Sequence, residues 1–143
     1  MTQGQVTLSY PATRGVMRAC TTSTPWGRAQ DAVTYGRGVT FYSTPGHGGF
    51  RVSREKNRTV PSYLRNDTGW YEEDCDWARV AVAFPALFTE EERVAADAAL
   101  CNWAPGAWEA VHGRALLPGD SHARDRETFN REHAGDWVAC AAW

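Results

Sequence analysis

The sequence lacks the marks of a membrane or secreted protein. Its longest mainly apolar run, Val80–Phe88, is far too short to span a bilayer, so we expect no membrane segment. The start, MTQGQVTLSY, has neither a basic nor an apolar region, which predicts that there is no secretory signal. The four cysteines lie far apart without a CxxC pair, which favours buried free thiols over a disulfide framework. We therefore expect a cytoplasmic protein with reduced cysteines.

Ligand-spacing motifs are missing as well. The four histidines and four cysteines show no paired zinc spacing, and neither a P-loop nor a dinucleotide fingerprint is present. The sequence thus predicts no metal and no cofactor. The net charge of -2 gives no global field that would attract DNA or an anionic membrane, so we do not expect a nucleic acid or a membrane as partner.

Charge is instead concentrated locally. Lysine occurs only at position 56, and arginine supplies the rest of the 15 Lys and Arg residues. A basic segment is followed closely by an acidic block; they comprise Arg51, Arg54, Lys56, Arg58 and Arg65, and then Glu72, Glu73, Asp74 and Asp76. The arginine preference fits bidentate phosphate binding, but we favour the codon bias of a GC-rich genome as its cause. A local anion site is therefore one of two open interpretations.

The remaining pattern predicts a single α+β domain spanning residues 1–143. Residues 32–53 are rich in β-branched and aromatic residues around the turn TPGHGG, which indicates a β-hairpin. A strand over 136–143 is an option for the last stretch. Three or four helices would pack against this small antiparallel sheet. They cover 67–84, 90–102 with a capping box at Thr89, 106–113, and 121–135 with Ser121 as N-cap, while 61–65 would form one helical turn.

The stretch STPGHGGFRVS, residues 43–53, is the first candidate site. Glycines uncover backbone N–H groups, so this loop could form an anion-binding nest to which nearby arginines add charge. The residues concerned are Gly46, His47, Gly48, Gly49, Arg51 and Arg54. The alternative is an ordinary hairpin tip whose glycines supply positive φ angles and whose His47 is exposed.

The acidic stretch GWYEEDCDW is the second candidate. On a helix, Glu72 and Asp76 share one face, so two carboxylates could reach a metal, a ribose hydroxyl or a cationic partner. The alternative is a solvated acidic helix start. We disfavour a Cys75–His47 nucleophile, because the neighbouring carboxylates would raise the pKa of the thiol. Of the tryptophans, Trp70 and Trp77 are expected in the core, and Trp26 on a loop is the best exposed stacking residue.

Together, TPGHGG, GWYEED and the AFP ending resemble a family of small uncharacterised domains found in phage and plasmid genes. The resemblance covers about residues 24–88. It implies that the loop and the acidic stretch belong to one site. The residues carried over are His47, Gly48, Gly49, Trp70, Tyr71, Glu72, Glu73, Asp74 and Trp77.

Three functions follow as hypotheses, and we favour the first. It is a phage or mobile-element accessory protein, a non-enzymatic binder that sequesters a phosphate-bearing nucleotide signal or blocks a host defence protein. Its ligand-binding residues would be Gly46, His47, Gly48, Gly49, Arg51, Arg54, Trp70, Tyr71, Glu72, Glu73 and Asp74. The second is a small hydrolase or phosphodiesterase with His47, Glu73 and Asp74 as catalytic candidates, aided by Glu72 and Asp76. The third is a protein-interaction module that uses the acidic helix.

Overall fold

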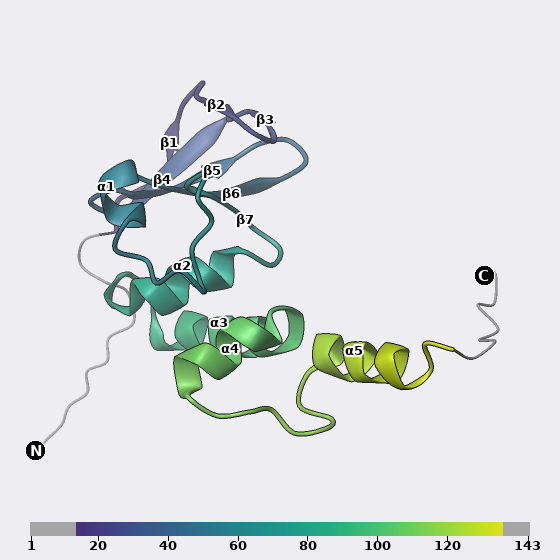
Figure 1. Ribbon diagram of the computed structural model, residues 1–143. Coiled ribbons are helices and arrows are strands. Elements are labelled where there is room, and N and C mark those ends of the chain that lie inside the picture. Colours follow the sequence, from purple (N-terminus) through teal and green to yellow (C-terminus); the bar gives the residue numbers. More distant parts are fainter. Residues whose placement is uncertain (1–13, 136–143) are drawn as a thin grey trace, which may run out of the picture.

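The structure, a computed structural model, describes residues 14–135 and has an α+β fold (Figure 1). Five antiparallel strands form one sheet in the order β1-β4-β5-β6-β7, and β2 and β3 form a separate two-stranded ribbon. The strands are β1 (Arg18–Ala19), β2 (Ser23–Thr24), β3 (Gly27–Arg28), β4 (Asp31–Gly36), β5 (Val39–Ser43), β6 (Gly48–Val52) and β7 (Trp70–Glu72). The helices are α1 (Arg54–Asn57), α2 (Trp77–Ala83), η1 (Pro85–Leu87), α3 (Glu90–Trp103), α4 (Pro105–His112) and α5 (His122–Glu132).

The predicted hairpin is present, but its first arm is two strands. The chain turns at Arg37 and Gly38, where Gly38 has a φ of +81°, and the register between β4 and β5 shifts near this turn. Glycine tolerates this left-handed backbone without a steric penalty. The second turn, between β5 and β6, contains His47 as predicted. The result is a three-stranded meander.

The predicted helix over 67–84 is wrong in its first half. Residues Trp70–Glu72 form β7, which pairs with β6, and helix α2 starts only at Trp77. Tyr71 lies opposite Phe50 on the face of the sheet that packs on the core, and both side chains are buried. After the strand, the Glu72 carboxylate accepts hydrogen bonds from the backbone N–H groups of Asp74 and Cys75 and closes a turn. Tertiary pairing therefore overrides the local helix signals.

The later helices match the prediction closely. Helix α3 begins with a capping box between Thr89 and Glu92, and Ser121 caps α5 by accepting from the Arg124 N–H. Pro61 accepts from the N–H groups of Leu64 and Arg65, which confirms the predicted helical turn. Helix α1, in contrast, falls in a region for which no helix was predicted. The optional strand at 136–143 lies outside the described residues.

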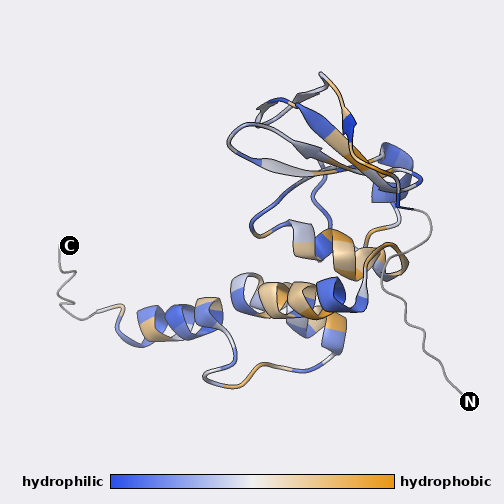
Figure 2. Cartoon of the chain, turned by 180° about the vertical axis from the view of Figure 1, so that it is seen from behind, coloured by the Kyte–Doolittle hydropathy of each residue, from blue (hydrophilic) through white to orange (hydrophobic). Residues whose placement is uncertain are grey.

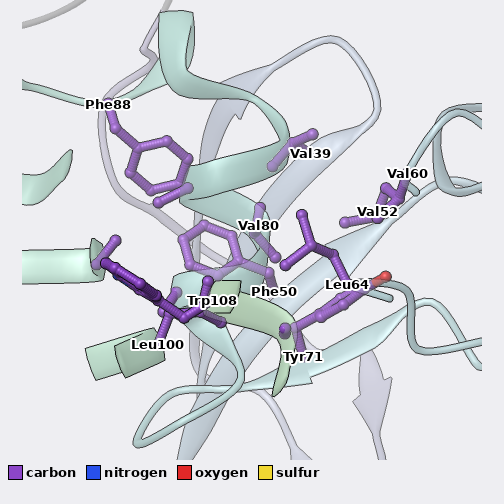
Figure 3. Close-up of a cluster of buried hydrophobic side chains, with 14 residues drawn as sticks. Val39, Phe50, Val52, Val60, Leu64, Tyr71, Val80, Phe88, Leu100 and Trp108 are labelled. Atoms are coloured by element: carbon purple, nitrogen blue, oxygen red, sulfur yellow. The ribbon is translucent and has the colours of Figure 1, made fainter. Parts of the chain in front are cut away.

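The core lies between the inner face of the sheet and the helices. Side chains from β5, β6 and β7 meet those of α2, α3 and α4 in this core (Figure 3). The hydropathy colouring shows hydrophobic segments in the sheet and in the central helices (Figure 2). Helix α5 lies apart from the sheet (Figure 1) and is joined to α4 by the ion pair between Arg124 and Glu109, 2.8 Å long. No helix within residues 14–135 is long and apolar enough to cross a membrane. Because α2, α3 and α4 all pack on the inner face of the sheet, its outer face is turned away from them.

Candidate functional site

The His47 loop is held together by its own hydrogen bonds. The Thr44 hydroxyl donates to the His47 carbonyl at 2.6 Å and accepts from the His47 N–H at 3.1 Å. The Thr44 N–H also donates to the same carbonyl. The amide of His47 is therefore used within the loop, while its imidazole is exposed and makes no hydrogen bond with another residue of the described part.

The glycines of this loop serve close packing, which neither sequence interpretation anticipated. None of Gly46, Gly48 and Gly49 has a positive φ. A Cβ at Gly48 would lie 2.7 Å from the Tyr42 carbonyl oxygen, and one at Gly49 would collide with the Trp26 indole and the Tyr71 carbonyl. The expectation that these glycines supply positive φ angles is wrong. At Gly48 and Gly49 they make room for neighbouring strands and for Trp26.

The loop and the acidic stretch do meet, at one point. The Glu73 N–H donates to the Gly48 carbonyl at 2.9 Å, and the Glu73 carboxylate lies over Gly48. Asp74 is exposed, and no hydrogen bond or ion pair between described residues joins its side chain to His47. The structure thus brings Gly48 and Glu73 together without connecting the catalytic candidates.

Aromatic side chains gather on the outer face of the sheet. Trp26, from the β2–β3 turn, packs edge to face on Trp70, with ring centroids 5.6 Å apart. Tyr42 lies 5.9 Å from Trp70, and the Arg51 guanidinium lies 5.2 Å from the Trp70 ring centre, within cation–π range. Trp70 is half-buried here, so its expected place in the core is wrong; Trp26 is half-buried too.

A groove of about 350 Å³ runs beside these rings, and we call it the aromatic groove. It contains two carboxylates, those of Glu72 and Asp76. Burial alone would raise the pKa of Glu72, but hydrogen bonds from the N–H groups of Cys75 and Asp74 outweigh it and lower the pKa below its ordinary value. Glu72 is therefore a carboxylate anion at neutral pH. The lining residues are Pro25, Trp26, Asn66, Thr68, Trp70, Glu72 and Asp76.

A larger pocket of about 590 Å³ lies next to the aromatic groove, and we call it the basic pocket. Four arginines line it against a single carboxylate, that of Asp67. The lining residues are Arg51, Val52, Arg54, Asn57, Arg58, Arg65, Asp67, Thr68 and Gly69. Because Thr68 belongs to both linings, the two cavities are neighbours.

The four arginines differ in their contacts. Arg51 donates to the Thr68 carbonyl at 2.8 Å, and Arg65 donates to the Asp67 carboxylate at 3.1 Å. Arg54 and Arg58 are exposed, and neither guanidinium has a hydrogen bond or an ion pair within residues 14–135. Two of the four cations are therefore available to an anionic ligand.

Local backbone features build the basic pocket. Ser53 caps α1 by accepting from the Lys56 N–H, and this helix sets Arg54 and Arg58 one turn apart on the same side. At Gly69, where φ is +80°, a Cβ would lie 2.9 Å from the Arg51 guanidinium. Only glycine lets the chain reach β7 while leaving room for Arg51.

Tyr71 is a buried residue whose hydroxyl group bonds to one residue in the wall of each cavity. It is 1 % exposed, and its hydroxyl donates to Asn57 Oδ1 at 2.6 Å and accepts from the Asn66 N–H at 2.9 Å. Asn57 lines the basic pocket and Asn66 lines the aromatic groove. The expectation that Tyr71 is a ligand-binding residue is wrong, because its ring is inside the core. Trp70 is the neighbouring ring that reaches solvent.

The metal-ligating and thiol side chains of residues 14–135 were expected to show no metal site and no reactive cysteine. Within residues 14–135, no group of three or more histidine, cysteine, aspartate or glutamate side chains is placed to hold a metal ion. Cys20, Cys75 and Cys101 are free thiols, and Cys140 lies outside the described residues. Burial makes the largest contribution to raising the pKa of Cys75, and the negative charges of Glu72 and the neighbouring aspartates raise it further. A raised pKa opposes thiolate formation.

The fold and the site define a small α+β domain with an arginine-lined pocket beside an aromatic groove. The chain belongs to the family described as Domain of unknown function (DUF7007), which matches residues 19–134. That range contains both the TPGHGG loop and the GWYEED stretch, and the match confirms an uncharacterised family. No curated protein and no solved structure matches the chain significantly.

Proposed function

We propose that this domain binds a phosphate-bearing nucleotide without converting it. The observation that carries the proposal is the basic pocket, which two unpaired arginines, Arg54 and Arg58, line together with Arg51. The Arg51 guanidinium in turn lies over the half-buried indole of Trp70. A volume of about 590 Å³ falls in the range typical of small-molecule sites. Phosphate and aromatic base are the two chemical groups that such neighbours bind best.

The arginines supply the phosphate end. Guanidinium groups bind phosphate oxygens bidentately and stay charged at every physiological pH. Arg51 is already oriented by its bond to the Thr68 carbonyl and by its position over Trp70, so little side-chain entropy is lost when a ligand binds. Arg54 and Arg58 add charge that no described residue neutralises.

The aromatic groove supplies the base end. Trp26 and Trp70 offer indole surface there, and stacking of a base on an aromatic side chain contributes about 1–3 kcal/mol. Because the groove and the basic pocket share Thr68, one ligand can occupy both.

Binding without catalysis is favoured by the position of His47. This residue precedes the first residue of β6, whereas Arg51 lies near the other end of the strand. At about 3.3 Å per residue the two Cα atoms are about 13 Å apart. The hydrolase alternative would need His47 at the phosphate. As a pure binder the domain would act by sequestering its ligand; a counter-defence role in a phage or mobile element, and a host protein as partner, stay predictions.

The experiment is a thermal-shift and calorimetry survey of nucleoside monophosphates, diphosphates and cyclic dinucleotides. The double variant Arg54→Gln/Arg58→Gln should lose the stabilisation that the wild type gains. The matched control, Arg18→Gln/Arg126→Gln, removes the same charge from two exposed positions, one on the edge strand β1 and one on α5, and should keep it. If no nucleotide stabilises the wild type, or if both double variants respond alike, the proposal is wrong.

A further inference from the structure

Three polar side chains in the aromatic groove form a pattern of acceptors and a donor. Glu72 and Asp76 contribute carboxylates, which are acceptors only, and Asn66 contributes an amide. They lie beside the indoles of Trp26 and Trp70, where a stacked base would present its edge.

The hydrogen bonds within the groove show which atoms remain for a ligand. Glu72 uses Oε1 to accept from the N–H groups of Asp74 and Cys75, at 2.8 and 3.0 Å, and the Asp74 side chain and the Asp76 N–H also interact with this carboxylate. A carboxylate offers about four lone-pair sites, so acceptor capacity remains. Asp76 has one long ion pair, in which its Oδ1 lies 3.7 Å from Arg79 Nε. Both carboxylates therefore keep acceptor capacity.

The amide of Asn66 is oriented by its neighbour. Its Oδ1 accepts from the Thr68 N–H at 3.0 Å and from the Thr68 hydroxyl at 2.8 Å. These bonds fix the position of the oxygen and leave Nδ2 as a donor without a partner in the described part of the chain. The groove thus offers two acceptors and one donor.

Among the common bases, guanine complements this set. Its Watson–Crick edge carries two adjacent donors, N1–H and the 2-amino group, followed by the O6 acceptor. Adenine and cytosine carry a single amino group next to an acceptor nitrogen. A carboxylate would be repelled by the lone pair of that nitrogen. Uracil has one N–H between two carbonyl oxygens. Carboxylates accept hydrogen bonds and cannot donate them, so they discriminate by the number of donors that they meet.

We infer that the aromatic groove selects the guanine base of a nucleotide whose phosphates lie in the basic pocket, an inference that rests on the proposed nucleotide binding. Glu72 and Asp76 accept from the two guanine donors, and the Asn66 amide donates to O6. The charges are arranged in the order that such a nucleotide requires. On the outer face of the sheet, Glu72 lies two residues after Trp70 on β7, and Arg51 is the cross-strand partner of Trp70 on β6. Acids therefore meet the base, and arginines meet the phosphate.

The test compares GDP, IDP and ADP by calorimetry at one salt concentration. Inosine lacks only the 2-amino group of guanine, so IDP isolates that contact. GDP should bind about 10- to 100-fold more tightly than ADP, which corresponds to one good bidentate contact to a base, and IDP should fall between them.

The key variant is Glu72→Gln, which keeps an Oε1 acceptor for the turn but replaces the other oxygen with a donor. It should abolish the preference for GDP, and Asp76→Asn should reduce it. Glu91→Gln is the matched control, because Glu91 is an exposed carboxylate on α3 that lines neither cavity; it should leave the preference intact. Near-ultraviolet circular dichroism checks that each variant is folded.

The outcomes separate the two proposals. If GDP and ADP bind equally, or if Glu72→Gln and Asp76→Asn leave the preference unchanged, the guanine inference is wrong and nucleotide binding stands. If none of the three nucleotides binds the wild type, the guanine inference is wrong, and nucleotide binding falls with it only when the wider survey of monophosphates and cyclic dinucleotides also gives no binding.

Discussion

Replacing Gly49 with alanine tests the packing of the TPGHGG loop against Trp26. An alanine Cβ at this position would collide with two ring carbons of Trp26 and with the Tyr71 carbonyl oxygen. The indole can rotate away, but the carbonyl belongs to the backbone of β7 and cannot move without disturbing the β6–β7 ladder. The substitution should therefore displace Trp26 and strain the sheet edge.

The magnitude follows from overpacking. An added methyl group in a well-packed site costs about 1–3 kcal/mol. Alanine in place of glycine also removes freedom from the unfolded chain, which offsets about 0.4–1 kcal/mol. We expect a net loss of about 1–2 kcal/mol in the free energy of unfolding, or roughly 3–8 °C in Tm for a chain of this length.

Gly46→Ala provides the matched control in the same motif. A Cβ there meets nothing within 4 Å, and the φ of Gly46 is not positive, so this change should be neutral or slightly stabilising. Urea denaturation followed by tryptophan fluorescence measures both variants, and the near-ultraviolet spectrum reports the Trp26–Trp70 pair. Equal stabilities for Gly49→Ala and Gly46→Ala would refute the packing argument.

Three further results are expected. Tyr71→Phe should lower the free energy of unfolding by about 1–3 kcal/mol, because it leaves the buried Asn57 acceptor unpaired; an unchanged urea midpoint would contradict this. Burial opposes ionisation of Glu92, but the hydrogen bonds from Arg14 hold the pKa of this carboxyl group below the ordinary 4.5. The Arg14–Glu92 pair therefore contributes its full stabilisation above pH 4.5 and loses it as the pH falls through the lowered pKa. The stability gap between wild type and Glu92→Gln should accordingly close in acid, and a constant gap to pH 3 would count against the pair. Burial and neighbouring carboxylates raise the pKa of Cys75, so iodoacetamide should alkylate it at pH 8 more slowly than free cysteine; a faster rate would contradict the shift.

The helices that sequence patterns predicted correctly are those with local start signals. Thr89 and Ser121 cap α3 and α5 through side chains that lie within three residues of their partners, so a short window contains the information. The stretch from Trp70 to Asp76 has equally strong local signals, and yet its first three residues form a strand. Carboxylates can mark a helix start or close a turn after a strand, and only the pairing of Tyr71 with Phe50 decides between them.

The candidate site was predicted in parts but not in its arrangement. Arg51 and Arg54 were expected at the phosphate, and Trp26 as a stacking residue was suggested by its loop position. Sequence distance could not show that β6 carries Arg51 away from His47, nor that Asn66 and Thr68 connect two cavities. Side chains that meet across strands are set by register, and register depends on partners far away in the sequence.

Side chains along β6 and β7 alternate between the two faces of the sheet, so one set belongs to the core and the other to the candidate site. In β6 and β7, Phe50 and Tyr71 face inward, and the residues on either side of them, among them Arg51 and Trp70, face outward. The Tyr71 hydroxyl then reaches from the core to Asn57 and Asn66, one in each cavity wall. The relative position of the basic pocket and the aromatic groove is therefore fixed by a buried residue that no ligand touches. Loss of that hydroxyl should weaken nucleotide binding even where the fold survives, because the two ends of the ligand would meet walls that are no longer held in register.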